Sequence, residues 1–245
     1  MRFEQIVRFN WPFYAAAALA VTAAAVVIPH LPAAWWIRGP AYLSAGLVAM
    51  WLVASLVASW IVYDRSRLMR WDWVLQALGF DPRSWINIHA GHDESSDALR
   101  RIFKDARGRV FDIFSPEAMT EPSIARARRM SKHADAAEHA DYRRLPLPAG
   151  TIDVATLLLS AHELRSDEAR GALFTELRRV LGPGGRVVVA EHLRDWANFL
   201  AYGPGVLHFH SRRTWVRCFT RHRFDVHAEF SITPFVRIFV LRRLT

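Results

Sequence analysis

The sequence has little cysteine, no internal repeat and, in two long stretches, no charge. Its 245 residues include a single cysteine, Cys218. One cysteine excludes an internal disulfide and any zinc cluster built from cysteines, and it fits a reducing compartment. No nucleophile motif surrounds Cys218, so we expect it to be an ordinary packing residue and not a catalytic thiol.

Charge is absent from residues 11–29 and from residues 41–63. Each stretch has about the twenty-residue length that is needed to cross a bilayer. Tryptophan and tyrosine gather near the ends of both stretches, where membrane proteins carry aromatic belts. A cleaved signal peptide has a shorter apolar run and is not followed closely by a second one. The sequence therefore predicts two membrane spans within residues 1–63, with the lipid bilayer as their partner.

Basic residues flank the two predicted spans on one side. Arg2 and Arg8 precede the first span and three arginines follow the second, whereas the connection between the spans carries only Arg38. By the positive-inside rule, we expect a multi-pass protein of a bacterial-type inner (cytoplasmic) membrane with both termini in the cytoplasm.

Residues 64–83 predict a linker helix next to the membrane. An apolar stripe runs along it, with arginines on either side. The helix can lie at the membrane interface, where each basic residue adds about 1 kcal/mol of binding to anionic headgroups. It can also cover the first strand of the domain that follows, and the sequence leaves both interpretations open.

The net charge of +9 comes from arginine. Such a charge suits nucleic acid, an anionic membrane surface or an anionic ligand. The basic segment ARARRM, residues 125–130, has no interleaved aromatic residues that bases could stack on. We therefore expect no nucleic-acid partner, and the sequence indicates no particular protein partner or oligomeric state.

The stretch from residue 141 to residue 192 predicts a parallel α/β unit. Residues 153–159 are a nearly continuous apolar run without helical period, which is typical of a strand covered on both faces. A helix capped near Ser166 follows and stops at the turn GPGG, after which RVVVAEH predicts a second buried strand. Strand, helix and strand in this order form a right-handed crossover.

These residues resemble the C-terminal half of class I S-adenosylmethionine-dependent methyltransferases, and most closely the small-molecule, quinone and lipid methyltransferases. The resemblance rests on LPLPAGTIDVATLLLSAHEL followed by RRVLGPGGRVVVAEH, with an acidic residue four positions before Leu-Pro. It implies an α/β Rossmann-like fold over residues 84–245, with a mostly parallel seven-stranded sheet and a C-terminal antiparallel hairpin, preceded here by a transmembrane helical hairpin. It also implies S-adenosyl-L-methionine as the cofactor.

The resemblance assigns cofactor-binding roles by position. The loop after the first predicted strand, residues 84–90, corresponds to a family loop with an acidic residue and three spaced glycines, of which this chain keeps one. Asp112 lies near the place of the family's ribose-binding carboxylate, and Asp141 matches the residue that accepts a hydrogen bond from adenine, although it can also cap its loop. The implied cofactor-binding residues are Asn87, His89, Gly91, Asp93, Asp112, Asp141, Tyr142 and Ser160.

Polar residues beyond the fourth and fifth predicted strands are the catalytic candidates. Ligands of parallel sheets bind beyond the carboxyl ends of the strands where the strand order reverses. The candidates are His162, Glu163 and His192. Methyl transfer needs a base only if the acceptor begins protonated, and imidazole titrates near neutral pH. Each histidine is a candidate base and, equally, a candidate wall residue of the pocket.

Two histidine pairs invite comparison with metal sites. They are His89 with His92, and His208 with His210. No further partner at a recognisable ligand spacing completes a site around the first pair, and the second pair suits pocket lining or a surface position better. We therefore expect no bound metal.

Anchoring indicates the class of acceptor. A domain held at a membrane surface meets lipids, quinones and isoprenoids at high effective concentration. The predicted function is therefore methylation of a hydrophobic or membrane-associated small molecule. The missing glycines motivate two alternatives: a catalytically inactive scaffold or partner-binding subunit with the same fold, and a different use of the same cofactor.

Overall fold

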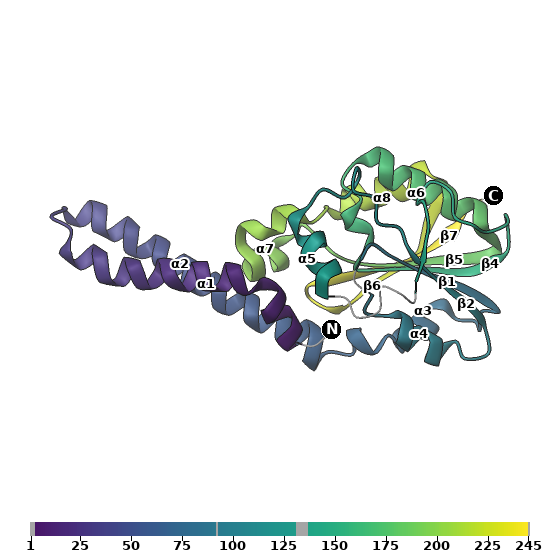
Figure 1. The fold of residues 1–245 in the computed structure, drawn as a ribbon, viewed down its shortest axis with the longest axis horizontal. Coiled ribbons are helices and arrows are strands. Elements are labelled where there is room, and N and C mark those ends of the chain that lie inside the picture. Colours follow the sequence, from purple (N-terminus) through teal and green to yellow (C-terminus); the bar gives the residue numbers. More distant parts are fainter. Residues whose placement is uncertain (1–2, 92, 131–136, 245) are drawn as a thin grey trace.

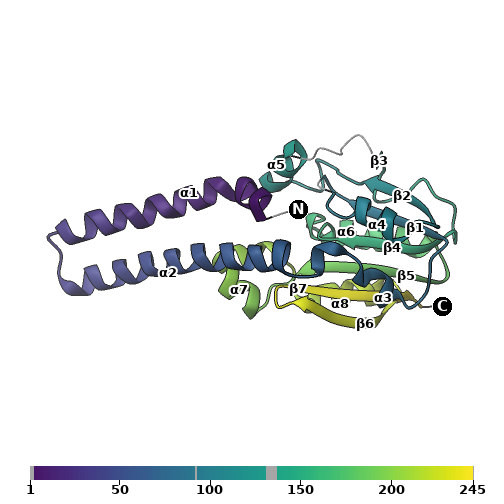
Figure 2. The ribbon, with the colours of Figure 1, turned by 90° about the horizontal axis from the view of Figure 1, so that it is seen from below.

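The chain forms a long helical hairpin joined to an α/β domain (Figure 1). The computed structural model describes residues 3–91, 93–130 and 137–244. In two views at right angles, the hairpin projects from one end of the domain as two helices that lie side by side (Figure 2). Its elements are α1 (Phe3–Val27), η1 (Ile28–His30) and α2 (Trp35–Trp60).

Both helices of the hairpin are exposed along most of their length. The segments Phe3–His30 and Trp35–Arg65 are long and apolar enough to cross a membrane, and 6% and 17% of their most apolar windows are buried. Leu19 and Trp35, for example, are 71% and 79% exposed. A helix in a soluble core buries its apolar side chains. The described part of this chain leaves the apolar faces of the hairpin uncovered.

The linker that follows α2 packs on the domain. The apolar stripe predicted for it faces the sheet, because Leu68, Trp71 and Val74 are fully buried in a cluster that also holds Trp85 and Leu99. Of the two interpretations of the linker, the structure supports the one in which it covers the first strand. Its elements are η2 (Ile61–Arg65), η3 (Leu68–Arg70) and α3 (Trp73–Leu78).

One seven-stranded sheet organises the domain, in the order β3-β2-β1-β4-β5-β7-β6. Neighbours from β3 to β5 pair in parallel, and β7 pairs antiparallel with both β5 and β6. The predicted Rossmann-like fold with its antiparallel C-terminal hairpin is confirmed. The strands are β1 (Ser84–His89), β2 (Arg107–Asp112), β3 (Glu138–His139), β4 (Ile152–Leu158), β5 (Leu181–His192), β6 (Phe224–Thr233) and β7 (Val236–Arg243).

Helices cover both faces of the sheet. Successive residues of β5 alternate between the two apolar clusters, with Val187 and Val189 in one and Val188 and Ala190 in the other. This alternation is why an apolar run without helical period predicted a strand buried on both sides. The covering helices include α4 (Ser96–Ile102) on one face, and α6 (Asp167–Val180) and α8 (Arg212–Arg221) on the other.

The strand order reverses between β1 and β4, and the hairpin docks at the edge where these strands end. The ring of Trp51 in α2 packs edge-on against Phe199, with centroids 5.7 Å apart. Gly203 approaches Trp51 so closely that a Cβ there would lie 2.6 Å from the indole. The elements around this edge are α5 (Pro122–Met130), η5 (Ala161–Glu163), α7 (Trp196–Tyr202) and η6 (Gly203–His208).

Candidate functional site

A buried carboxylate fixes His162 at the end of β4. Glu191, in β5, is fully buried, and its Oε2 lies 2.7 Å from His162 Nδ1. Its Oε1 accepts hydrogen bonds from the backbone N–H groups of Ala161 and His162, at 2.8 and 3.2 Å. The ring of His162 is therefore held through Nδ1, which leaves Nε2 as its free coordinating or proton-carrying atom.

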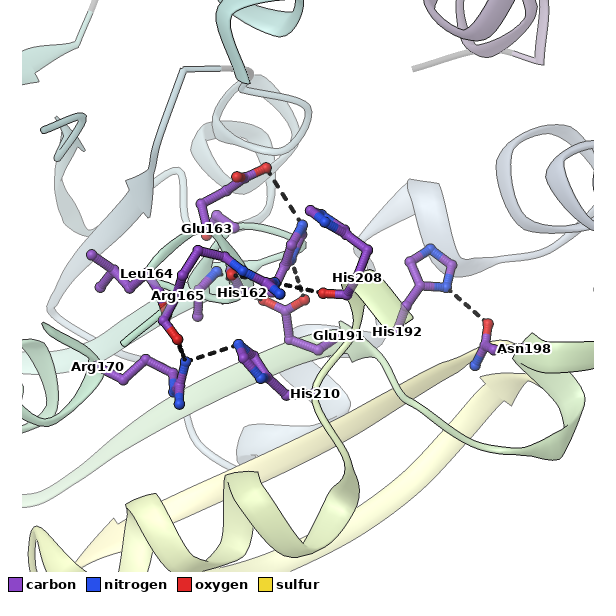
Figure 3. Close-up of polar contacts among 12 residues, drawn as sticks. His162, Glu163, Leu164, Arg165, Arg170, Glu191, His192, Asn198, His208 and His210 are labelled. Atoms are coloured by element: carbon purple, nitrogen blue, oxygen red, sulfur yellow. Dashed lines mark hydrogen bonds and ion pairs between the residues drawn. The ribbon is translucent and has the colours of Figure 1, made fainter. Parts of the chain in front are cut away.

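Glu163 and His208 meet His162 on the side of the ring away from Glu191 (Figure 3). Glu163 Oε1 lies 3.5 Å from His162 Nε2, and the rings of His162 and His208 are 5.3 Å apart. Burial opposes a charge on His162, but the two carboxylates outweigh it and raise the pKa of the imidazole to about 10. Burial together with the charge on His162 lowers the pKa of His208. The two carboxylates therefore favour the imidazolium form of His162.

His192, at the end of β5, is held in one tautomer. Its Nδ1 lies 2.9 Å from the carbonyl oxygen of Phe235. A carbonyl only accepts hydrogen bonds, so Nδ1 carries the proton and Nε2 carries the lone pair. Burial and the nearby charge of His162 lower the pKa of His192 to about 4, and its ring stacks on Phe209 at 4.9 Å. His192 is a neutral hydrogen-bond acceptor.

These side chains line one end of a cavity of about 690 Å³. The other end is formed by the hairpin, through residues of α1 and α2 such as Phe9, Phe13 and Ser55. The polar residues of the domain that line it include His162, Glu163, His192 and His208. The cavity therefore joins apolar helices to the ends of β4 and β5.

The predicted cofactor loop after β1 is held together by its own polar groups. Asn87 is 1% exposed, and its Nδ2 donates to the hydroxyls of Ser95 and Ser96 at 2.9 and 2.8 Å. Its Oδ1 accepts a hydrogen bond from Thr156 at 2.7 Å. Asp93 accepts from the backbone N–H groups of Ser95 and Ser96, at 3.1 and 2.9 Å. Both predicted residues therefore position the start of α4.

Gly91 and Asp112 are brought together by Arg128 of α5. Asp112 ends β2, and its Oδ2 lies 2.6 Å from Arg128 Nη1. Gly91 has a φ of +137°, and a Cβ on it would lie 2.4 Å from Arg128 Cγ. Both the positive φ and the lack of space for a Cβ favour glycine at this position. Arg128 thus crosses the place where the resemblance puts the cofactor.

The remaining predicted residues have separate neighbours. His89 is 4% exposed, and its Nδ1 accepts from the backbone N–H of Gly91 at 3.3 Å, while His92 lies outside the described residues. Ser160 donates to the carbonyl of Ile88 at 2.8 Å, which ties the end of β4 to β1.

Beyond β3, Asp141 is 56% exposed and accepts from the backbone N–H of Arg143 at 2.8 Å. Tyr142 is 2% exposed, and the Arg143 guanidinium lies 4.4 Å from its ring centre.

The residues on the β1–β2 side fit an adenosyl group in their chemistry. The Asp112 carboxylate at a strand end can accept hydrogen bonds from ribose hydroxyls, and Gly91 lets the backbone approach a ligand closely. Asp112 is paired with Arg128 across the same space. An adenosyl group bound at this place would require the Arg128 side chain to move aside.

Three residues that belong to the site were not among the predicted site residues: Glu191, Arg128 and His208, the last of which was expected only as a pocket-lining or surface residue. Glu191 directly precedes His192, and an acidic residue inside an apolar strand is itself a signal. His208 and His210, which share one face of an extended chain, separate in the structure. His208 ends η6 beside His162, whereas His210 lies 2.8 Å from Arg170.

Comparison with known proteins relates this chain to methyltransferases. A family model described as a methyltransferase domain matches residues 98–189, from α4 to β5. None of the curated proteins matches the sequence.

Several solved structures share the fold. A SAM-dependent methyltransferase from Aquifex aeolicus is 15% identical, with a TM-score of 0.53 over 73% of this chain and 93% of that one. A geranyl diphosphate C-methyltransferase from Streptomyces coelicolor A3(2), solved with Mg²⁺, geranyl diphosphate and S-adenosyl-L-homocysteine, is 16% identical. Its TM-score is 0.50, over 71% of this chain and 78% of that one.

Proposed function

We propose that this chain is a class I S-adenosylmethionine-dependent methyltransferase that is anchored in a membrane by its N-terminal hairpin and methylates a hydrophobic acceptor there. One observation carries the proposal. The cavity at the ends of β4 and β5 is walled on its far side by helices that are long and apolar enough to span a bilayer.

The cavity suits an amphipathic acceptor. Its volume of about 690 Å³ is within the range of small-molecule sites, roughly 300 to 1,000 Å³. Ile6, Phe9 and Phe13 offer apolar contacts along α1, while His162, Glu163 and His192 offer polar ones at the sheet. An acceptor with an apolar tail can therefore enter between the helices with its polar group towards the domain. Lipids, quinones and isoprenoids have this form.

The proposed topology follows from the arginines. They flank the two spans at the end that leads into the domain, so both termini and the domain lie on the cytoplasmic side of an inner membrane. The guanidinium of Arg126, in α5, lies 5.2 and 5.4 Å from the ring centres of Phe9 and Phe13. This cation–π contact joins the domain to the start of α1, where anionic headgroups would lie.

The cofactor supplies an electrophilic methyl group on a sulfonium, which is already a good leaving group. Asp112, Gly91 and Asp141 would hold its adenosyl part. The other residues would align the acceptor and exclude water. His192 is neutral, and its Nε2 lone pair can accept a hydrogen bond from a hydroxyl or amine of the methyl acceptor. Glu163 and His162 would hold the polar group of the acceptor beside it.

A matched pair of tryptophan substitutions tests the proposal. Ser55→Trp would fill the cavity from α2, and Val53→Trp adds the same bulk to the same helix at a residue that is 60% exposed. The full chain in liposomes of bacterial lipid extract is given S-adenosylmethionine labelled in its methyl group. We expect label in the organic phase, at least tenfold less of it with Ser55→Trp, and no change with Val53→Trp.

Binding of S-adenosylmethionine, measured by calorimetry, should be the same in both variants. Label that appears only in water-soluble products would overturn the hydrophobic acceptor. Equal activity of the two variants would show that the cavity is not the acceptor site.

A further inference from the structure

The feature that leads beyond methyl transfer is the group of three side chains at the domain end of the cavity. His162, Glu163 and His208 each offer one ligand atom, and these atoms lie within 4.8 Å of one another. Nitrogen and oxygen ligands lie about 2.0–2.2 Å from a bound zinc ion, so neighbouring ligand atoms are roughly 3–4 Å apart. The 3.5 Å between His162 Nε2 and Glu163 Oε1 already has that spacing. A small movement of His208 would complete the set.

Glu163 provides an independent sign that a ligand is missing from this arrangement. Its side chain is 16% exposed, and its Oε2 is buried without a hydrogen-bond partner among the described residues. A buried carboxylate oxygen without a partner is costly, and a bound ion or water is one explanation for such an atom. The unpartnered oxygen belongs to one of the three residues of the set.

Glu191 orients His162 as a carboxylate orients a metal-binding histidine. It holds Nδ1 at 2.7 Å and is itself fixed by the backbone N–H groups of Ala161 and His162. Histidine ligands of metals usually give their second N–H to a carboxylate, which sets the tautomer and increases the basicity of the coordinating nitrogen. Nε2 of His162 faces Glu163 (Figure 3).

The charges around the three side chains favour a cation. Glu163 and Glu191 contribute two carboxylates. A neighbouring arginine, Arg165, is paired with Glu121 at 3.6 Å and donates to the carbonyl oxygen of His208 at 2.5 Å. Its charge is thus shared with a third carboxylate.

We propose that His162 Nε2, the Glu163 carboxylate and His208 bind one divalent transition-metal ion at the end of the acceptor cavity, with Glu191 positioning His162. Two imidazoles and one carboxylate suit Zn²⁺, Mn²⁺ or Fe²⁺, whereas Mg²⁺ takes oxygen ligands. Three protein ligands leave coordination positions open, and the open side is the cavity. If the proposed function holds, as this last step assumes, the ion would bind an oxygen of the acceptor's polar group.

Calorimetry on the full chain in detergent, stripped with EDTA and then exchanged into chelator-free buffer, tests the site with ZnCl₂ as the probe. We expect one Zn²⁺ per chain and at least a tenfold loss of affinity in both Glu163→Gln and His208→Ala. His227→Ala removes an exposed histidine far from the cavity and should bind like the unchanged chain. MgCl₂ at the same concentration should give no comparable heat.

Thermal unfolding provides the second measurement and controls for folding. Zn²⁺ should raise the unfolding temperature of the unchanged chain and of His227→Ala, but not of Glu163→Gln or His208→Ala. Equal zinc binding by all four proteins, or none by the unchanged chain, would overturn the site. Methyl transfer and S-adenosylmethionine binding, measured on the same samples, separate the two proposals. Methylation of lipid without zinc binding would overturn only the metal site. Zinc binding without methylation would overturn only the proposed function.

Discussion

Polar residues at the carboxyl edge of the sheet have different surroundings in its two halves. Beyond β4 and β5, His162, Glu163 and His192 line a cavity, and one oxygen of Glu163 has no partner among the described residues. At the ends of β1 and β2, Asn87 and Asp112 form hydrogen bonds with other side chains of the protein. Under the proposed function, the first half is open to an acceptor that enters from the hairpin. The second half would exchange a protein partner for the cofactor.

This difference shows what the altered glycine loop does. In place of two of the family's glycines, the chain has His89 and Asp93, which form hydrogen bonds within the loop, and the Arg128 side chain lies against the glycine that remains. Under the proposed function, the acceptor half is preformed, and the cofactor half is closed by the Arg128–Asp112 ion pair. The predictions below test each half in turn.

The largest effect is expected for Glu191→Ala, in the preformed half. Glu191 is fully buried and holds both the backbone of η5 and the ring of His162. Removing one partner of a buried pair leaves the other without compensation, so we expect a loss of about 3 kcal/mol in the free energy of unfolding. Denaturant unfolding of the detergent-solubilised chain measures it. Glu168→Ala, on an exposed turn of α6, should change little, and equal losses in both would contradict the role of Glu191.

A smaller effect is expected for Arg128→Ala in the closed half, where the substitution should strengthen cofactor binding. The Arg128–Asp112 pair is partly buried, with 31% and 9% of the side chains exposed, and it would have to open for a cofactor to bind at Asp112. A charged hydrogen bond of this kind contributes about 1.5 kcal/mol, so its removal should tighten S-adenosylmethionine binding by about tenfold.

Calorimetry would measure that change, with Arg129→Ala as the matched control, since Arg129 is exposed on the same helix. Weaker binding by Arg128→Ala would instead mean that the guanidinium holds the cofactor.

Much of the fold could be predicted because its signals are local. The apolar run of β4, the Ser166 cap, the stop at Gly182 and the run of β5 each reflect burial or backbone geometry within a few residues. The apolar stripe of the linker could also be predicted, because it follows from the spacing of its apolar residues. The sequence could not decide what the stripe packs against, because a membrane interface and a sheet both bury the same apolar face.

The site was less predictable because its members come from distant segments. His162 and Glu163 were expected beyond β4, but His208 reaches them through the 3₁₀ segment η6, whose shape has no sequence period that fixes it. Because the segment is not an extended strand, His208 and His210 do not lie together, and the H-x-H spacing did not predict the neighbours of either residue. Arg128 lies in the basic segment 125–130, whose sequence indicates no particular partner, and the tertiary packing of α5 directs it to Asp112.

The smallest effect is expected for Asp141→Ala, which separates a cofactor role from a structural one. Asp141 is 56% exposed, and its Oδ1 accepts a hydrogen bond from the backbone of Arg143. An exposed loop residue contributes little to stability, so the unfolding midpoint should stay within the range of the exposed control Asp105→Ala. If Asp141 accepts a hydrogen bond from adenine, losing that bond costs about 1 kcal/mol, and S-adenosylmethionine should bind roughly fivefold more weakly. Unchanged affinity with a lowered midpoint would assign Asp141 to its loop, and the closed half would then hold the cofactor through Gly91 and Asp112 alone.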